Sequence, residues 1–402
     1  MAKKNLENLV EAQGVLVNSD LHGNSRILES GLSYAKDNNL IYLDNGDWIN
    51  DYRLKEYSRD LGIISPEDIQ NEYLASNLSQ QDLEAYLIAK NAHDHGVDAL
   101  VDSVSKEHRE DARKQLEDVL EYSRSELFQK RISELSSRFI EEKGEEMKAN
   151  GLRMRALYDV FMDEEARRFA DSLNKYSDVT VLFNKGNHEN VGFVENVRMY
   201  LDNKDQIVDL NEQEDVYKIR SKNKSEMSIV GMTNCVQPMQ YLREIFSPEE
   251  IEILYSHMVS EKKVPKNGLD LFVTHGQVGE VVGVSNPIQV PYLESAKDLS
   301  LEAKLTVEGH IHNKYDGKNS FGKDMVRAAG EQGVVITKDK SGKLNKKWVK
   351  LGEGYDGGHN NPIPYDTEYM AMRVENRLKE YELMMQQAAN DNDTQSSSKA
   401  AA

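Results

Sequence analysis

Short clusters of Asp, Asn, His and Gly residues recur along this sequence, each following an apolar run that predicts a β-strand. They are Asp20-Leu21-His22-Gly23-Asn24, Gly46-Asp47, Gly186-Asn187-His188-Glu189, Thr274-His275-Gly276 and Gly309-His310-Ile311-His312. Short apolar runs suit buried parallel strands, and open α/β sheets bind ligands beyond the carboxyl ends of such strands. The neighbouring glycines allow sharp turns. We therefore expect an α/β fold that directs these side chains toward a shared point.

The strand pattern begins with a βαβ unit. Strands are expected at 15–18 and 40–43, with a helix at about 25–38 between them. Further strand signals are present at 179–183, 227–230, 269–274 and 305–307. Residues 333–336 and 347–351 are expected to form a hairpin that turns at Ser341-Gly342.

Residues 52–175 have a different character, because glycine is sparse there and Pro66 is the segment's one proline. Ser65-Pro66-Glu67-Asp68 has the cap, the first-turn proline and the acids of a helix start. The run 105–143 is expected to be one long amphipathic helix that ends at Gly144. We interpret 52–175 as a helical insertion that serves as a lid or a dimerisation element.

The C-terminal part, 352–402, is expected to contain a loop, a helix at about 367–389 and a disordered polar tail from Asn390. The remaining segments, 1–51 and 176–351, then form one discontinuous α/β domain.

The residue types of the clusters point to metal binding. Mixed Asp, Asn and His ligands favour divalent metals such as Mn, Fe, Zn or Mg, and the single cysteine, Cys235, cannot build a thiolate site. A bridging carboxylate can hold two such ions about 3.5–4 Å apart, where they activate water for attack on a phosphoryl group.

The five clusters, in this order, resemble the motifs of the calcineurin-like metallophosphoesterase superfamily. The resemblance covers about 14–51 and 176–351, and it implies a four-layer α/β/β/α sandwich with a two-metal site. Manganese is the favoured metal, with Fe, Zn or Mg as alternatives. The resemblance implies one role for each matching residue: Asp20, His22 and His312 on the first metal, Asn187, His275 and His310 on the second, Asp47 as the bridge and His188 as the general acid.

Some positions depart from the pattern of the protein serine/threonine phosphatases. Their Asp-Arg-Gly sequence after Gly-Asp is missing, and Lys185 stands where they place an arginine. Lysine offers a point charge instead of a bidentate fork, which argues against a standard phosphoprotein phosphatase. Either Asn50 or Asp51 would orient His188, and we favour Asp51. Lys185 is a candidate phosphate ligand. Asn24 is equally a phosphate ligand or a helix cap.

Charge and composition limit the partners. The 402 residues include 69 acidic and 50 basic side chains, for a net charge of −19, which disfavours general nucleic-acid binding. Six lysines between Lys338 and Lys350 fit a solvated hairpin better than a nucleic-acid contact. His93-Asp94-His95 fits a solvated helix end better than a metal site. The sequence shows neither a membrane span nor a secretory signal at 1–13, so a cytoplasmic protein is expected.

The leading functional hypothesis is a metal-dependent phosphatase or phosphodiesterase acting on phosphate mono- or diesters. Two alternatives stay open. One is a DNA or RNA nuclease of the same superfamily, and the other is a non-catalytic scaffold with the same fold. A homodimer formed through the helical insertion is the expected protein partnership.

Overall fold

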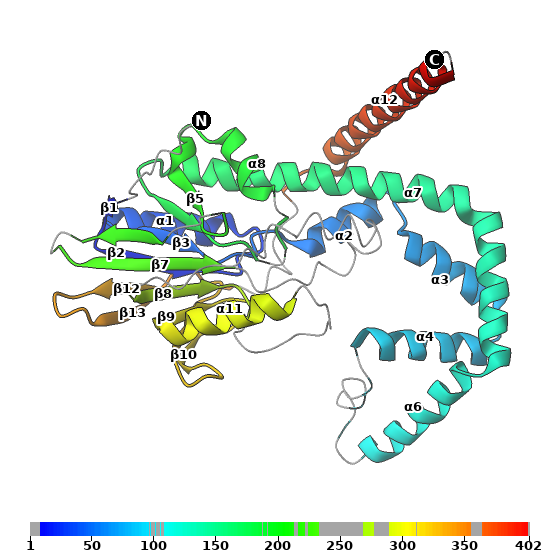
Figure 1. Ribbon diagram of the computed structural model, residues 1–402, viewed down its shortest axis with the longest axis horizontal. Helices are drawn as coiled ribbons and strands as arrows, with labels where there is room; N and C mark the ends of the chain where they lie inside the picture. Colours follow the sequence, from blue (N-terminus) through cyan, green and yellow to red (C-terminus); the bar gives the residue numbers. More distant parts are fainter. Residues whose placement is uncertain are drawn as a thin grey trace. The chain divides into compact units, whose positions relative to one another are not determined.

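The computed structural model describes residues 9–95, 108–186, 188–190, 192–212, 216–221, 224–232, 268–276, 289–310, 312–354 and 364–400, together with Val97, Val101 and Ser105. The chain divides into two compact units (Figure 1). A sheet unit comprises Met1–Leu61 and Ala156–Ala402, and a helical unit comprises Gly62–Arg155. The expected insertion, 52–175, extends beyond this helical unit at both ends.

One sheet of the sheet unit has six strands in the order β13-β12-β2-β3-β4-β5. They are β2 (Gly14–Asn18), β3 (Ile41–Asp44), β4 (Val181–Phe183), β5 (Ile207–Asp209), β12 (Gln332–Lys338) and β13 (Leu344–Lys350). Strands β2 to β5 run parallel, whereas β12 and β13 form the expected antiparallel hairpin.

The second sheet has seven strands in the order β1-β6-β7-β8-β9-β11-β10. They are β1 (Leu9–Glu11), β6 (Tyr217–Arg220), β7 (Glu226–Met232), β8 (Leu269–Thr274), β9 (Ala303–Glu308), β10 (Tyr315–Lys318) and β11 (Asp324–Arg327). Strands β7, β8 and β9 run parallel, so β8 and β9 end at the same edge.

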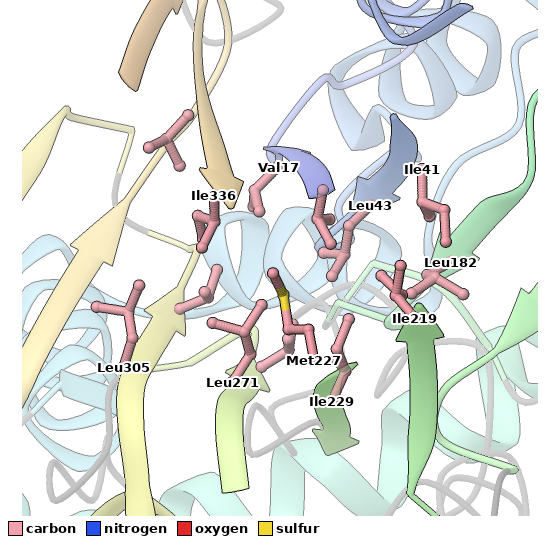
Figure 2. Close-up of a cluster of buried hydrophobic side chains, with 14 of the residues drawn as sticks. Val17, Ile41, Leu43, Leu182, Ile219, Met227, Ile229, Leu271, Leu305 and Ile336 are labelled. Carbon is pink, nitrogen blue, oxygen red and sulfur yellow. The ribbon is translucent and has the colours of Figure 1, made fainter. Parts of the chain in front are cut away.

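The two sheets face each other across an apolar core (Figure 2). Val17, Leu43 and Ile336 of the six-stranded sheet point toward Leu271 and Leu305 of the other, and all five side chains are buried. Every second residue of a strand faces the same side, which is why these strands supply alternate side chains to the core.

Helices cover both outer faces. On the six-stranded sheet lie α1 (Ser25–Asp37), α8 (Phe193–Tyr200) and the end of α7 (Glu126–Asn174), where Phe169 contacts Phe183 and Phe193. A single 3-10 turn, η2 (Lys204–Gln206), follows α8. Helix α11 (Gln289–Glu302) packs on β8 and β9. The expected four-layer α/β/β/α architecture is confirmed (Figure 1).

The chain leaves the sheet unit through α2 (Asp51–Asp60) and returns through α7. Between them the helical unit holds α3 (Pro66–Asn77), α4 (Gln80–His95) and α6 (Arg109–Ser123). The predicted helix start at Ser65 is confirmed, because its hydroxyl accepts a hydrogen bond from Asp68 N at 3.0 Å. Within this unit Asp82 is buried and binds the Tyr122 hydroxyl at 2.6 Å and the Arg131 guanidinium.

Two helix predictions need correction. The expected single helix over 105–143 is interrupted at Arg124-Ser125, where the Ser125 hydroxyl caps a new helix. That helix, α7, continues through Gly144, because one glycine costs only about 1 kcal/mol in a long helix. Helix α12 (Thr367–Ala400) likewise extends beyond the expected end at 389, and neither proline nor glycine interrupts it. The disordered tail predicted from Asn390 is therefore wrong as far as Ala400.

None of the described helices combines the length and the apolar character that crossing a bilayer requires.

Candidate metal centre

Five loops bring the predicted ligands together. Asp20 and His22 follow β2, Asp47 follows β3, and His275 follows β8, each immediately beyond a parallel strand. His188 follows β4, and His310 and His312 follow β9. The carboxyl ends of parallel strands meet at one edge of each sheet, so loops distant in the sequence converge there.

The backbone of these loops is unusual. Asp20, His22, Asp47 and His310 all have positive φ, between 44° and 65°, a region that residues with a Cβ rarely adopt. Gly186 shows how close the loops lie, because a Cβ there would be 2.1 Å from Asp47 Oδ1. Strain of this kind is held by surrounding structure and is concentrated at functional sites.

A first group of possible metal ligands consists of Asp20, His22 and His312, whose ligand atoms all lie within 4.8 Å of one another. His22 Nε2 is 3.0 Å from His312 Nε2, and His312 Nε2 is 3.5 Å from Asp20 Oδ1. Asp20 is fully buried, and Ser19 donates a hydrogen bond to its other oxygen. These are the three residues expected to hold the first metal.

A second group consists of Asp47, His275 and His310, again within 4.8 Å. Asp47 Oδ2 lies 3.0 Å from His275 Nε2. The two groups adjoin, because the same His275 nitrogen is 4.0 Å from Asp20 Oδ1. Asn187, the remaining predicted ligand of this metal, lies outside the described residues.

The imidazole tautomers fit a bound cation. His275 Nδ1 is 2.6 Å from the Asn45 carbonyl oxygen. A carbonyl oxygen can only accept a hydrogen bond, so Nδ1 carries the hydrogen, and in the neutral ring Nε2 has the lone pair that binds metal. His275 Nε2 is buried, and among the described residues it has no hydrogen bond. It lies 3.0 Å from Asp47 Oδ2. Two atoms that both offer an electron pair can lie this close only with a proton or a cation between them, and in the metal-free chain the raised pKa of His275 places a proton there.

His22 has the same arrangement, with Nδ1 3.1 Å from the Ile49 carbonyl oxygen and Nε2 directed at His312. Metal-bound histidines characteristically donate their second nitrogen to a carbonyl or carboxylate, which fixes the ring. The donor set of carboxylates and imidazoles therefore fits divalent ions of the Mn, Fe and Zn type.

Burial and charge shape the protonation of these groups. Burial, reinforced by the charge of His188, lowers the pKa of His22 to about 3, and burial lowers that of His310 to about 4. Burial would also lower the pKa of His275, but the Asp47 carboxylate outweighs it and raises the value to about 10. The pKa of Asp47 stays well below its usual range despite burial, because His188 and His275 are beside it. His22 and His310 are thus neutral and ready to bind metal.

His188, the predicted general acid, lies beside Asp47 and His22. Its Nε2 is 3.7 Å from Asp47 Oδ2, its backbone N–H donates to Asp47 Oδ1 at 3.2 Å, and its ring centre is 5.1 Å from that of His22. Asp51 begins α2, but its side chain lies outside the described residues. Asn50, the alternative orienting residue, caps α2 and donates from Nδ2 to the His22 carbonyl oxygen at 3.1 Å.

The two predicted substrate-binding residues have structural contacts. Asn24 caps α1, because its Oδ1 accepts a hydrogen bond from Ile27 N at 3.2 Å. The Lys185 ammonium is buried and lies 2.5 Å from Asp209 Oδ2. Lys185 thus forms a buried ion pair with Asp209. Side chains of the segment His93-Asp94-His95 and the whole of Cys235 lie outside the described residues.

Sequence reasoning missed the function of Glu189. Its buried carboxylate accepts hydrogen bonds from the backbone N–H groups of Asp47 (3.0 Å), Ile49 (3.0 Å) and Gly186 (2.8 Å), so it fixes the loops that carry Asp47 and His188. Glu189 does belong to the Gly-Asn-His-Glu cluster, but the sequence does not show what an acidic residue there would bind.

No protein-family model matches this chain, and no curated protein does. A solved structure of a putative 5'-nucleotidase from Staphylococcus aureus aligns with 90% of this chain at 11% identity and a TM-score of 0.35. This chain spans 58% of the length of that protein. A calcineurin-like phosphoesterase from Bacillus subtilis aligns over 92% of this chain and 98% of its own, at 11% identity and a TM-score of 0.34.

At 11% identity, neither protein's activity is assigned to this chain.

Proposed function

We propose that this chain is a metal-dependent phosphoesterase that hydrolyses phosphate mono- or diesters. The observation that carries the proposal is the pair of adjoining ligand groups at the ends of β2, β3, β8 and β9. Burying carboxylates and imidazoles costs free energy unless they are paired or bind metal. A fold that keeps two such groups together is consistent with a two-metal centre.

The site residues have distinct proposed roles. Two divalent ions, with manganese favoured over Fe, Zn or Mg, would activate a water molecule and neutralise charge on the phosphoryl oxygens. Asp47 is suited to bridge because its Oδ2 lies 3.0 Å from His275 Nε2, the nitrogen that is also 4.0 Å from Asp20 Oδ1 of the other group. Asp20, His22 and His312 would complete one site. His310, with Asn187, would complete the other.

His188 is proposed to protonate the leaving oxygen of the ester. Its side chain is 15% exposed, whereas that of Asp47 is 2% exposed, so a substrate can reach the imidazole from outside. A proton donor near neutral pH is the usual contribution of histidine to such a step. The chain therefore supplies both the ligands and the proton donor that phosphoester hydrolysis needs.

Ion pairs of three of the six hairpin lysines weaken the support for the nuclease alternative. In the lysine-rich hairpin, Lys338 pairs with Asp270, Lys346 with Asp316, and Lys350 with Glu353. Lysines neutralised in this way contribute little to the counterion release that drives nucleic-acid binding. The nuclease alternative therefore has less support from this hairpin than the sequence suggested.

The test is hydrolysis of p-nitrophenyl phosphate and bis-(p-nitrophenyl) phosphate with Mn²⁺. We expect Asp47→Asn to abolish turnover of both esters. p-Nitrophenolate leaves without protonation, so the His188→Ala variant is measured with phenyl phosphate, where we expect kcat to fall by about 10²–10⁴-fold, the usual contribution of a general acid. His108→Ala, at the start of α6, is the matched control and should leave kcat unchanged. Activity that persists in both variants would contradict the proposed roles of Asp47 and His188. Stoichiometric Mn²⁺ binding without hydrolysis of either ester would favour the scaffold alternative.

A further inference from the structure

One turn of helix α7 contacts the two loops that carry His22 and Asp47. Glu165 is fully buried in this turn, and both its oxygens accept hydrogen bonds from Arg168 Nη1, at 2.9 and 3.0 Å. Arg53 of α2, itself 2% exposed, places Nη1 3.5 Å from Glu165 Oε1. One buried carboxylate is thus shared by two guanidinium groups, and breaking either contact would leave a buried charge with fewer partners.

Both guanidinium groups also hold the loop that carries His22. The carbonyl oxygen of Gly23 accepts from Arg168 Nη2 at 3.1 Å and from Arg53 Nη2 at 3.3 Å. Gly23 directly follows His22 and has a φ of 72°. A Cβ at Gly23 would lie 2.3 Å from Arg53 Nη1, so only glycine permits this approach.

The same turn holds the loop that carries Asp47. Trp48 directly follows Asp47, is fully buried, and donates from Nε1 to the Glu165 carbonyl oxygen at 3.1 Å. The Arg168 guanidinium lies 5.8 Å from the centre of the Trp48 ring, within cation–π distance. Glu165 and Arg168 thus contact the residue after His22 and the residue after Asp47 at once.

We propose that Arg53, Glu165 and Arg168 are positioning residues that, together with the direct hydrogen bond from His22 N to the Asp47 carbonyl oxygen at 2.8 Å, fix the separation between the His22 and Asp47 loops. They act through the Gly23 carbonyl and the Trp48 indole. The proposal rests on the proposed metal centre. It also gives a role to α2 and α7, the helices through which the chain enters and leaves the helical unit.

The test compares Arg168→Gln with Arg167→Gln, because the two arginines are neighbours on one helix. Arg167 pairs instead with the buried Glu164, at 2.5 Å, and faces the Tyr365 ring. Isothermal titration with Mn²⁺ measures affinity without requiring activity. We expect Arg168→Gln to weaken binding of at least one Mn²⁺ by about tenfold, as loss of an outer contact does, and Arg167→Gln to bind as the wild type does.

Trp48→Phe is a second variant that keeps an aromatic six-membered ring and removes the pyrrole ring with its N–H donor. It should also weaken Mn²⁺ binding, and with the p-nitrophenyl esters it should lower kcat while KM changes little. Wild-type affinity in both Arg168→Gln and Trp48→Phe would overturn the proposal. So would equal weakening in Arg167→Gln, since this would indicate a general loss of stability.

These outcomes are separable from those of the proposed function. If the wild type binds Mn²⁺ but hydrolyses neither ester, the phosphoesterase proposal fails, while the affinity difference between Arg168→Gln and Arg167→Gln still decides the positioning role. Failure of the wild type to bind Mn²⁺ would overturn both.

Discussion

At the scale of single residues, the backbone of the candidate metal centre is strained. Asp20, His22, Asp47 and His310 have positive φ, and each such residue costs roughly 1–2 kcal/mol. Hydrogen bonds from the surroundings offset this cost, and the contacts of Glu189 with the Asp47 loop are one example. The sequence clusters predicted which residues are candidate ligands, because the ability to bind metal depends on the type of side chain. The positive φ of these residues does not follow from residue type, so it could not be predicted.

Lys185 shows why the sequence could not settle its substrate-binding residues. Its partner Asp209 ends β5, a short strand that gave no clear signal in the sequence. Without that strand, the buried carboxylate next to Lys185 could not be foreseen. A lysine near a motif is compatible with an internal ion pair and with a phosphate ligand, and only the three-dimensional neighbours separate the two.

The buried carboxylate of Asp270, away from the candidate metal centre, is expected to make the stability of the fold depend on pH. Asp270 on β8 is 2.7 Å from Lys338 Nζ and 2.9 Å from Lys304 Nζ. Burial would raise its pKa, but hydrogen bonds from Lys338, Ser228 and Lys304 outweigh burial and lower it. A lowered folded-state pKa stabilises the protein above the unfolded value of about 3.9, and this stability is lost as pH falls through the folded value.

Asp270→Asn is therefore expected to lower the free energy of unfolding by about 1–3 kcal/mol at pH 7. The difference from wild type should shrink as pH falls below about 4, the unfolded value of the carboxyl group. Urea denaturation between pH 7 and about pH 2 measures both effects. Asp316→Asn, which removes the partner of Lys346 on the surface, is the control and should change stability by less than about 0.5 kcal/mol. A pH-independent loss in Asp270→Asn would contradict the prediction.

At the scale of elements, buried apolar strands were predictable, whereas the short strands β6 and β10 were not. The apolar runs of β2, β3, β8 and β9 are buried on both faces and stand out in the sequence. Strands β10 and β6 carry exposed polar residues, so their patterns resemble loops. The break between α6 and α7 was missed because Arg124-Ser125 contains neither glycine nor proline.

The start of α3 provides a test of element stability. Ser65→Ala removes the hydroxyl that caps Asp68 N, which should cost about 1 kcal/mol. Amide hydrogen exchange in α3 should accelerate by about fivefold, and Ser76→Ala, an exposed serine in the same helix, should leave it unchanged. Equal exchange in both variants would show that the Ser65 cap does not limit opening of this helix.

At the scale of the whole molecule, two facing sheets gather ligands from both sheets into adjoining groups. The function of the helical unit stays a prediction: a lid or a dimerisation element. Exposed Leu127 and Ile140 on α7 are the apolar side chains that a dimer would cover. Neither is part of a sequence motif, which is why function could be predicted for the sheet unit and not for this one.

The metal content of the purified chain shows whether the two ligand groups bind two ions. We predict that the purified chain, reconstituted with Mn²⁺ and measured by equilibrium dialysis with elemental analysis, binds two ions per chain. His22→Ala and His275→Ala, which each remove one imidazole from a different group, should each lower that number. Lys346→Ala, on the hairpin, should still bind two. A wild-type chain without stoichiometric metal, or one whose metal content is unaffected by both histidine variants, would contradict the account.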